Sequence, residues 1–173
     1  MSDPMPDLTP EPGHFLVGIA ALIRDAHDQY LLLRRSEERD VGGGVWECVT
    51  GRVDQGESIE AALHREVAEE TGLAVHLEAI VGLSHFYRGE ARPENELQGV
   101  VFDCLVEDPA ALVPSAEHSA HRWLNASEAL AFLTADDAGT RWFRRSIERA
   151  EALRRIRPDG WASIHADGVT LDA

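Results

Sequence analysis

The segment 51–73 constrains this 173-residue chain more than any other part of it. Ser58 can cap the start of a helix, and Gly72 can end one in a left-handed conformation. Between them, apolar residues recur at the spacing of one helix face, at Ile59, Ala62, Leu63 and Val67. The segment therefore predicts a helix over 58–71 that packs one face against a core.

Three carboxylates lie close together on this predicted helix. Glu66, Glu69 and Glu70 are spaced i, i+3 and i+4, so they share one face. They repel one another, and they lie near the C-terminal end, where the helix dipole disfavours negative charge. A cation would relieve both penalties, and carboxylate oxygens suit Mg²⁺ or Mn²⁺. The alternative is a solvated acidic face, which is common on glutamate-rich helices.

The residues around these carboxylates are consistent with a metal site. Arg65 lies four residues before Glu69 and can pair with it. Gly51 and Gly56 bracket the loop before the helix, and they allow a backbone path that turns a carbonyl toward the ion. Glu57, at the end of this loop, can reach the same ion.

The same segment resembles the Nudix hydrolase family. It matches the pattern G-x5-E-x7-R-E-U-x-E-E-x-G-U, where U is aliphatic, at every fixed position: Gly51, Glu57, Arg65, Glu66, Val67, Glu69, Glu70, Gly72 and Leu73. The resemblance implies a single-domain α/β/α sandwich with a mixed β-sheet. It also implies hydrolysis of a nucleoside diphosphate linked to another group, with Mg²⁺ or Mn²⁺ as cofactor. By position, the implied metal ligands are Glu66, Glu69, Glu70, the carbonyl of Gly51, and Glu57 as a further ligand or supporting group.

Two further segments resemble one branch of that family. VWECVTG (45–51) and EHSAHRWL (117–124) are similar to the pyrophosphohydrolases of dATP and dihydroneopterin triphosphate. This resemblance implies that Glu117 is a loop carboxylate near the metal and acts as a ligand or a base; the alternative is a polar loop residue. Glu69 and Glu70 are the other candidates for the general base, with Arg65 supporting them.

The rest of the chain predicts an α/β domain. Apolar runs separated by a turn predict a hairpin of strands 15–24 and 29–35. Further strands are predicted at 45–50, 74–83, 99–107 and 123–124, and further helices at 127–133 and 140–157. We expect one domain over 14–157, with a mixed sheet covered on both faces, between an N-terminal tail (1–13) and a C-terminal tail (158–173).

Composition limits the partners. The chain has 31 acidic and 16 basic residues and a net charge of −15, which argues against a general binder of duplex nucleic acid. All basic residues are arginine, so lysine-based chemistry is excluded. Two cysteines, no targeting segment and no apolar run long enough for a bilayer predict a cytoplasmic protein without membrane contact. The segment 141–157 holds seven arginines, for which we favour pairing with nearby acids over nucleotide contact.

Several residues outside the motif are candidates for binding the substrate. Arg34 and Arg35 end a predicted strand, where a guanidinium can hold phosphate oxygens or simply face solvent. Trp46 can stack on a base, although a core position is the more common role. Arg52 and Tyr87 complete the candidate set.

We therefore expect a metal-dependent pyrophosphohydrolase. The preferred substrate is a (deoxy)nucleoside triphosphate or dihydroneopterin triphosphate, cut to a monophosphate and pyrophosphate. Alternatives are a dinucleoside polyphosphate, ADP-ribose or a nucleotide sugar and, from another class, a module that senses a nucleotide without turnover. The expected partner is a small nucleotide-type diphosphate, and the expected assembly is a monomer or a homodimer.

Overall fold

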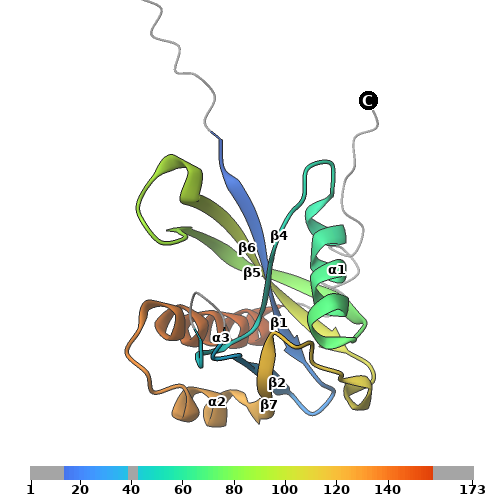
Figure 1. The fold of residues 1–173 in the computed structure, drawn as a ribbon. Coiled ribbons are helices and arrows are strands. Elements are labelled where there is room, and N and C mark those ends of the chain that lie inside the picture. The colour runs from blue at the N-terminus through green and yellow to red at the C-terminus, as the bar shows by residue number, and fades with distance from the viewer. Residues whose placement is uncertain (1–13, 39–42, 158–173) are drawn as a thin grey trace, which may run out of the picture.

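The computed structural model describes residues 14–38 and 43–157, so both predicted tails lie outside the described residues. In the described residues, two short 3₁₀ turns, Pro93–Asn95 and Pro109–Ala111, accompany seven strands and three α-helices. In chain order these are β1 (Leu16–Arg24), β2 (Gln29–Arg35), β3 (Trp46–Glu47), β4 (Val49–Arg52), α1 (Ile59–Thr71), β5 (Val75–Tyr87), β6 (Glu96–Val106), β7 (His118–Asn125), α2 (Ala126–Phe132) and α3 (Ala138–Ile156) (Figure 1). None of the described helices combines the length and the apolar character needed to cross a membrane.

The strands form one mixed sheet, as predicted. Its order is β3-β2-β1-β6-β5, while β4 pairs with β1 and β7 pairs with β2. The β1–β6 pair is parallel, and the other pairs are antiparallel. Strand β1 is central because it pairs with three strands: β2, its predicted hairpin partner; β4, the strand before α1; and β6, which belongs to the long β5–β6 hairpin.

Helices cover both faces of the sheet, which confirms the predicted sandwich. Alternate residues of β1 point to opposite faces, as a strand requires. Ile19 and Ala21 pack in the core beneath α1, whereas Ala20 and Leu22 pack in the core beneath α2 and α3. Figure 1 shows α1 and α3 on different sides of the sheet. In this article the two faces are named the α1 face and the α3 face.

Several strand bounds differ from the prediction. The segment 45–50 is not one strand, because β3 pairs with β2 whereas β4 pairs with β1, and the chain changes partner at Cys48. Strands β5 and β6 extend to Tyr87 and from Glu96, beyond the predicted bounds of 83 and 99, because the two strands continue to pair as far as Tyr87 and Glu96. Strand β7 spans 118–125 rather than 123–124, since it pairs with β2 over nearly its whole length.

Helix α1 forms as predicted. The Ala61 amide donates to the Ser58 hydroxyl oxygen at 3.1 Å, and Gly72 adopts φ 68° in the left-handed region. Ala62, Leu63 and Val67 are fully buried. Ile59 was predicted to join them but is 39% exposed, because it lies at the first position of the helix, before its buried face begins.

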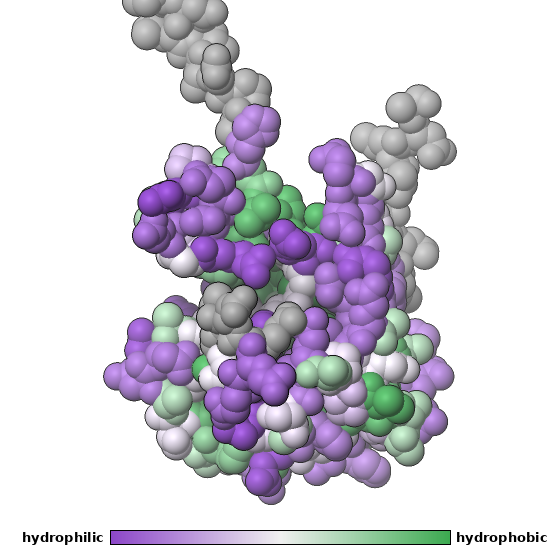
Figure 2. Space-filling view, viewed as in Figure 1, coloured by the Kyte–Doolittle hydropathy of each residue, from purple (hydrophilic) through white to green (hydrophobic). Residues whose placement is uncertain are grey.

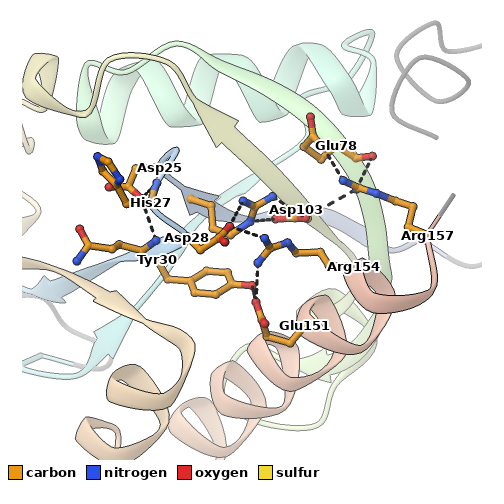
Figure 3. Close-up of polar contacts among 11 residues, drawn as sticks. Asp25, His27, Asp28, Tyr30, Glu78, Asp103, Glu151, Arg154 and Arg157 are labelled. Carbon is orange, nitrogen blue, oxygen red and sulfur yellow. Dashed lines mark hydrogen bonds and ion pairs between the residues drawn. The ribbon is translucent and has the colours of Figure 1, made fainter. Parts of the chain in front are cut away.

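Arginines of α3 pair with acids at the end of the sheet, which supports the structural interpretation of segment 141–157 (Figure 3). Arg157 contacts Glu78 of β5 at 2.6 Å, and Arg154 contacts Asp28 in the β1–β2 turn. Between them, the buried Arg24 of β1 donates to the buried Asp103 of β6 at 3.2 Å. This network attaches the last turns of α3 to the end of the sheet.

The Arg24–Asp103 pair generates a stability prediction. Asp103→Asn removes the buried charge partner of Arg24 and leaves it only the exposed Asp28 at 3.0 Å, so we expect the free energy of unfolding to fall by about 3 kcal/mol. Urea unfolding followed by circular dichroism measures this change. The control is Glu107→Gln, whose side chain is 79% exposed and pairs with the exposed His76, and which should change stability by less than about 0.5 kcal/mol. Equal losses in the two variants would contradict the importance of the buried pair.

Candidate active site

Arg65 gathers three of the predicted carboxylates. Its Nη2 lies 2.9 Å from Glu57, and its Nη1 lies 2.8 Å from Glu66 and 3.2 Å from Glu69. Nη2 also donates to the Arg52 carbonyl at 2.8 Å. Hydrogen bonds from Arg65 hold the pKa of the Glu57 carboxyl below its usual value, and they raise the pKa of Arg65 itself. The predicted Arg65–Glu69 pair is present, but it is the longest of the three.

Gly51 makes room for Glu66. A side-chain carbon at position 51 would lie 1.9 Å from the Glu66 carboxyl carbon, which is far too close for two atoms that are not bonded. The next residue, Arg52, donates its backbone N–H to Glu66 Oε1 at 3.2 Å. The glycine is therefore explained by the close approach of a carboxylate to strand β4.

Glu70 is buried, and the carboxylates that pair with Arg65 are those of Glu57, Glu66 and Glu69. Burial raises the pKa of its carboxyl to about 8, and the negative charges of Glu47, Glu66 and Glu117 add to the rise. His118 Nε2 lies 3.6 Å from Glu70 Oε2 and 3.5 Å from Glu47 Oε1. The carboxylates of α1 thus divide into an outer group around Arg65 and an inner residue, Glu70, beside the sheet.

The loop 113–118 is attached to the end of α1. The last carbonyls of a helix have no partners within it. Here the Val113 amide donates to the Thr71 carbonyl and the Ser115 amide to the Glu70 carbonyl, each at 2.8 Å. The Ser36 amide, just after β2, donates to the Glu117 carbonyl at 2.8 Å. These bonds hold Glu117 near Glu70, where its charge contributes to the raised pKa.

The donor chemistry around Gly51 fits a small divalent cation. In residues 14–38 and 43–157, no three His, Cys, Asp or Glu side chains form a ready-made metal cage. Arg65 supplies the positive charge beside the outer group. The donors are nevertheless hard oxygens, and the space left by Gly51 brings Glu66 against the strand. Burial is the main cause of the raised pKa of Glu70, and the nearby charges of Glu47, Glu66 and Glu117 raise it further.

Two predicted substrate residues lie on the other side of the sheet. Trp46 packs in the α3-face core, with its ring centroid 5.0 Å from that of Phe132. Arg34 pairs with Glu37 at 2.6 Å and lines a pocket of about 490 Å³ with Trp46 and Phe132. This pocket is on the face opposite the carboxylates, so the structure does not bring Arg34 and Trp46 to them.

Arg35 and Tyr87 lie on the α1 face, and Arg35 Nε is 2.9 Å from Glu47 Oε1. Arg52 is exposed directly after Gly51, and as the adjacent strand residue it faces the opposite side of the sheet from Gly51. Tyr87 is exposed at the end of β5, edge-on to the ring of His85 at 5.6 Å. Figure 2 shows hydrophilic surface over α1 and an apolar area between α1 and the upper ends of β5 and β6.

Sequence reasoning missed Glu47 as a member of this group. The sequence contained a sign of its role, because an acidic residue is unusual at the centre of VWECV, a segment whose other residues contribute to the cores on both faces of the sheet. His118 was noted only as the neighbour of Glu117. Its proximity to Glu47 and Glu70 depends on the pairing of β7 with β2, which local spacing does not reveal.

Several known proteins are similar to this chain in sequence or in fold. A protein of Myxococcus xanthus named octanoyltransferase is 38% identical over 107 residues, which are 62% of this chain and 29% of that protein. The nucleoside triphosphatase NudI of Salmonella schwarzengrund is 34% identical over 85 residues, 44% of this chain and 59% of that protein. The crystal structure of a MutT protein from Methanosarcina mazei Go1 is 28% identical with a TM-score of 0.66, and the match covers 84% of this chain and 98% of that one.

The chain spans less than two thirds of the length of these two curated relatives, so their names describe proteins that it matches only in part. The family is shown by a wider match, in which a sequence profile of the NUDIX domain covers residues 14–145. This match, together with the shared fold, confirms the predicted resemblance. The chain belongs to the NUDIX domain family.

Proposed function

We propose that this protein is a metal-dependent hydrolase that cuts a diphosphate bond in a nucleoside-diphosphate-linked substrate. The observation that carries the proposal is the packing of Glu66 into the space left by Gly51, beside Glu57, Glu69 and Arg65. A solvated acidic face would not require that space. Relatives whose names contain nucleoside triphosphatase support the same reaction class.

The residues fit Mg²⁺ or Mn²⁺ as the cofactor. Glu66, Glu69 and Glu70 would hold the ion, with Glu57 and the Gly51 carbonyl as further ligands. When bound, the ion polarises the phosphoryl oxygens and lowers the pKa of an attacking water. Arg65 holds the outer carboxylates at fixed separations before binding.

One carboxylate accepts the proton of the attacking water. Glu69 is 61% exposed and can reach a solvent molecule, whereas Glu70 is buried between α1 and the sheet. Glu117 is fixed beside Glu70 by the loop that caps α1. The general base is therefore one of these three residues.

The preferred substrate is a (deoxy)nucleoside triphosphate or dihydroneopterin triphosphate. The apolar area beside α1 suits a ring system, and the exposed Leu83 and Tyr87 of β5 offer contacts for it. Arg52, exposed directly after Gly51 in the chain, stays a candidate for contact with the phosphates. The intact carboxylates favour turnover over a module that only senses a nucleotide.

A product-resolved screen tests the proposed function. The purified protein is incubated with Mg²⁺ or Mn²⁺ and with nucleoside triphosphates, dihydroneopterin triphosphate, dinucleoside polyphosphates, ADP-ribose and nucleotide sugars. We expect pyrophosphate and a monophosphate from a triphosphate substrate, and no product after chelation with EDTA. Binding without turnover of any compound would favour the sensing module.

Glu66→Gln tests the metal ligand directly. We expect the rate of hydrolysis to fall at least about 100-fold, because a neutral amide holds a divalent cation poorly. The matched control is Glu60→Gln, which removes the same charge from the first turn of the same helix, where Glu60 lies 3.9 Å from His64 Nε2. Equal rates in Glu66→Gln and the wild type would contradict the assignment.

Gly51→Ala tests the space beside the strand. The added methyl group displaces the Glu66 carboxylate, so we expect the affinity for Mn²⁺ to fall about 10-fold or more. Titration followed by electron paramagnetic resonance measures this affinity, and thermal unfolding of the metal-free protein checks the fold. Gly139→Ala, at the start of α3, is the control and should bind Mn²⁺ as the wild type does. Unchanged affinity in Gly51→Ala would mean that Glu66 is not a ligand.

A further inference from the structure

Four side chains from four different elements form a row behind the carboxylates of α1. Arg35 of β2 places Nε 2.9 Å from Glu47 Oε1 of β3. The same Glu47 oxygen lies 3.5 Å from His118 Nε2 of β7, and that nitrogen lies 3.6 Å from Glu70 Oε2 of α1. The row therefore runs from the sheet to the one carboxylate of the motif that Arg65 does not contact.

The row is shielded from water at its centre. The His118 side chain is only 1% exposed, and its Nδ1 has no hydrogen-bond partner among the described residues. Leaving a buried polar atom unpaired costs about 1–3 kcal/mol. An apolar side chain would avoid that cost, so stability alone does not explain a histidine at this position.

His118 lies close to two carboxylates, those of Glu47 and Glu70. Glu47 and Glu70 both lie near the His118 ring edge, and once Glu70 is ionised, as binding a cation requires, two carboxylates in a poorly hydrated place repel each other. Arg35 pairs with the same Glu47 oxygen, and the polar edge of the ring lies near both carboxylates. A backbone hydrogen bond from Thr50 also holds the Glu70 carboxyl, so the ring and this bond together orient it.

The backbone holds this ring firmly. The His118 amide donates to the Ser115 carbonyl at 3.1 Å, and the Ser115 amide donates to the Glu70 carbonyl at 2.8 Å. His118 also pairs with Arg35 where β7 meets β2. The ring is thus fixed relative to both the helix that carries Glu70 and the strand that carries Arg35.

We propose that Arg35, Glu47 and His118 are positioning residues that hold the Glu70 carboxylate in the orientation needed to bind the divalent cation. This inference rests on the proposed function and assigns Arg35 a supporting role in place of a direct phosphate contact. Groups that orient a metal ligand typically contribute about 10–100-fold to metal affinity. Neither Glu47 nor His118 needs to touch the ion or the substrate.

The test compares Mn²⁺ affinity with the stability of the metal-free protein. We expect His118→Leu to bind Mn²⁺ about 10–100-fold more weakly, with a thermal midpoint equal to or above that of the wild type. His118→Gln should recover part of the affinity, because its amide N–H can again lie between the carboxylates. His121→Leu makes the same substitution at an exposed position of the same strand and should leave affinity unchanged.

A second, isosteric variant guards against misfolding. Glu47→Gln keeps the size of the side chain and removes its charge, and it should also weaken Mn²⁺ binding about 10-fold. Glu37→Gln, an exposed glutamate paired with Arg34, is its control. Wild-type affinity in both His118→Leu and Glu47→Gln, or losses that only follow a lower thermal midpoint, would overturn this inference alone. A wild-type protein that binds no Mn²⁺ would overturn the proposed function and this inference together.

Discussion

Repulsion among carboxylates at the C-terminal half of α1 is the constraint that organises this protein. The chain relieves it in two directions. On the outer side, Arg65 contacts Glu57, Glu66 and Glu69; on the inner side, Glu70 faces His118. Arg65 thus balances the charge of the outer carboxylates, whereas Glu70 is buried near the charges of Glu47, Glu66 and Glu117, which together raise the pKa of its carboxyl.

The sheet supplies the geometry for this balance. Strand β4 lies against β1, the central strand, and its glycine lets α1 approach closely. The loop after β6 caps the last carbonyls of α1 and then continues into β7. Backbone hydrogen bonds therefore connect the helix, the loop that caps it and the sheet. The positions of the residues that carry the carboxylates are thus fixed by the fold.

What could be predicted from sequence was local. The caps and apolar face of α1 follow from neighbouring residues, and the fixed spacing of the motif identified Glu57, Glu66, Glu69 and Glu70. Glu47 and His118 were not predicted as site residues, because they come close to Glu70 through strand pairing between distant parts of the chain. Arg34 and Arg35 could not be told apart before the register of β2 was known, since adjacent strand residues face opposite sides.

The change of strand partner at Cys48 has a consequence for how this segment can vary in length. Glu47 and Gly51 are on different strands, yet both serve the α1 face, one toward His118 and the other toward Glu66. Strand residues alternate between faces, so one residue inserted or deleted between them would turn one of the two away from the helix. Substitutions in this short connection can be absorbed by the core, whereas a change in its length would separate the two halves of the site.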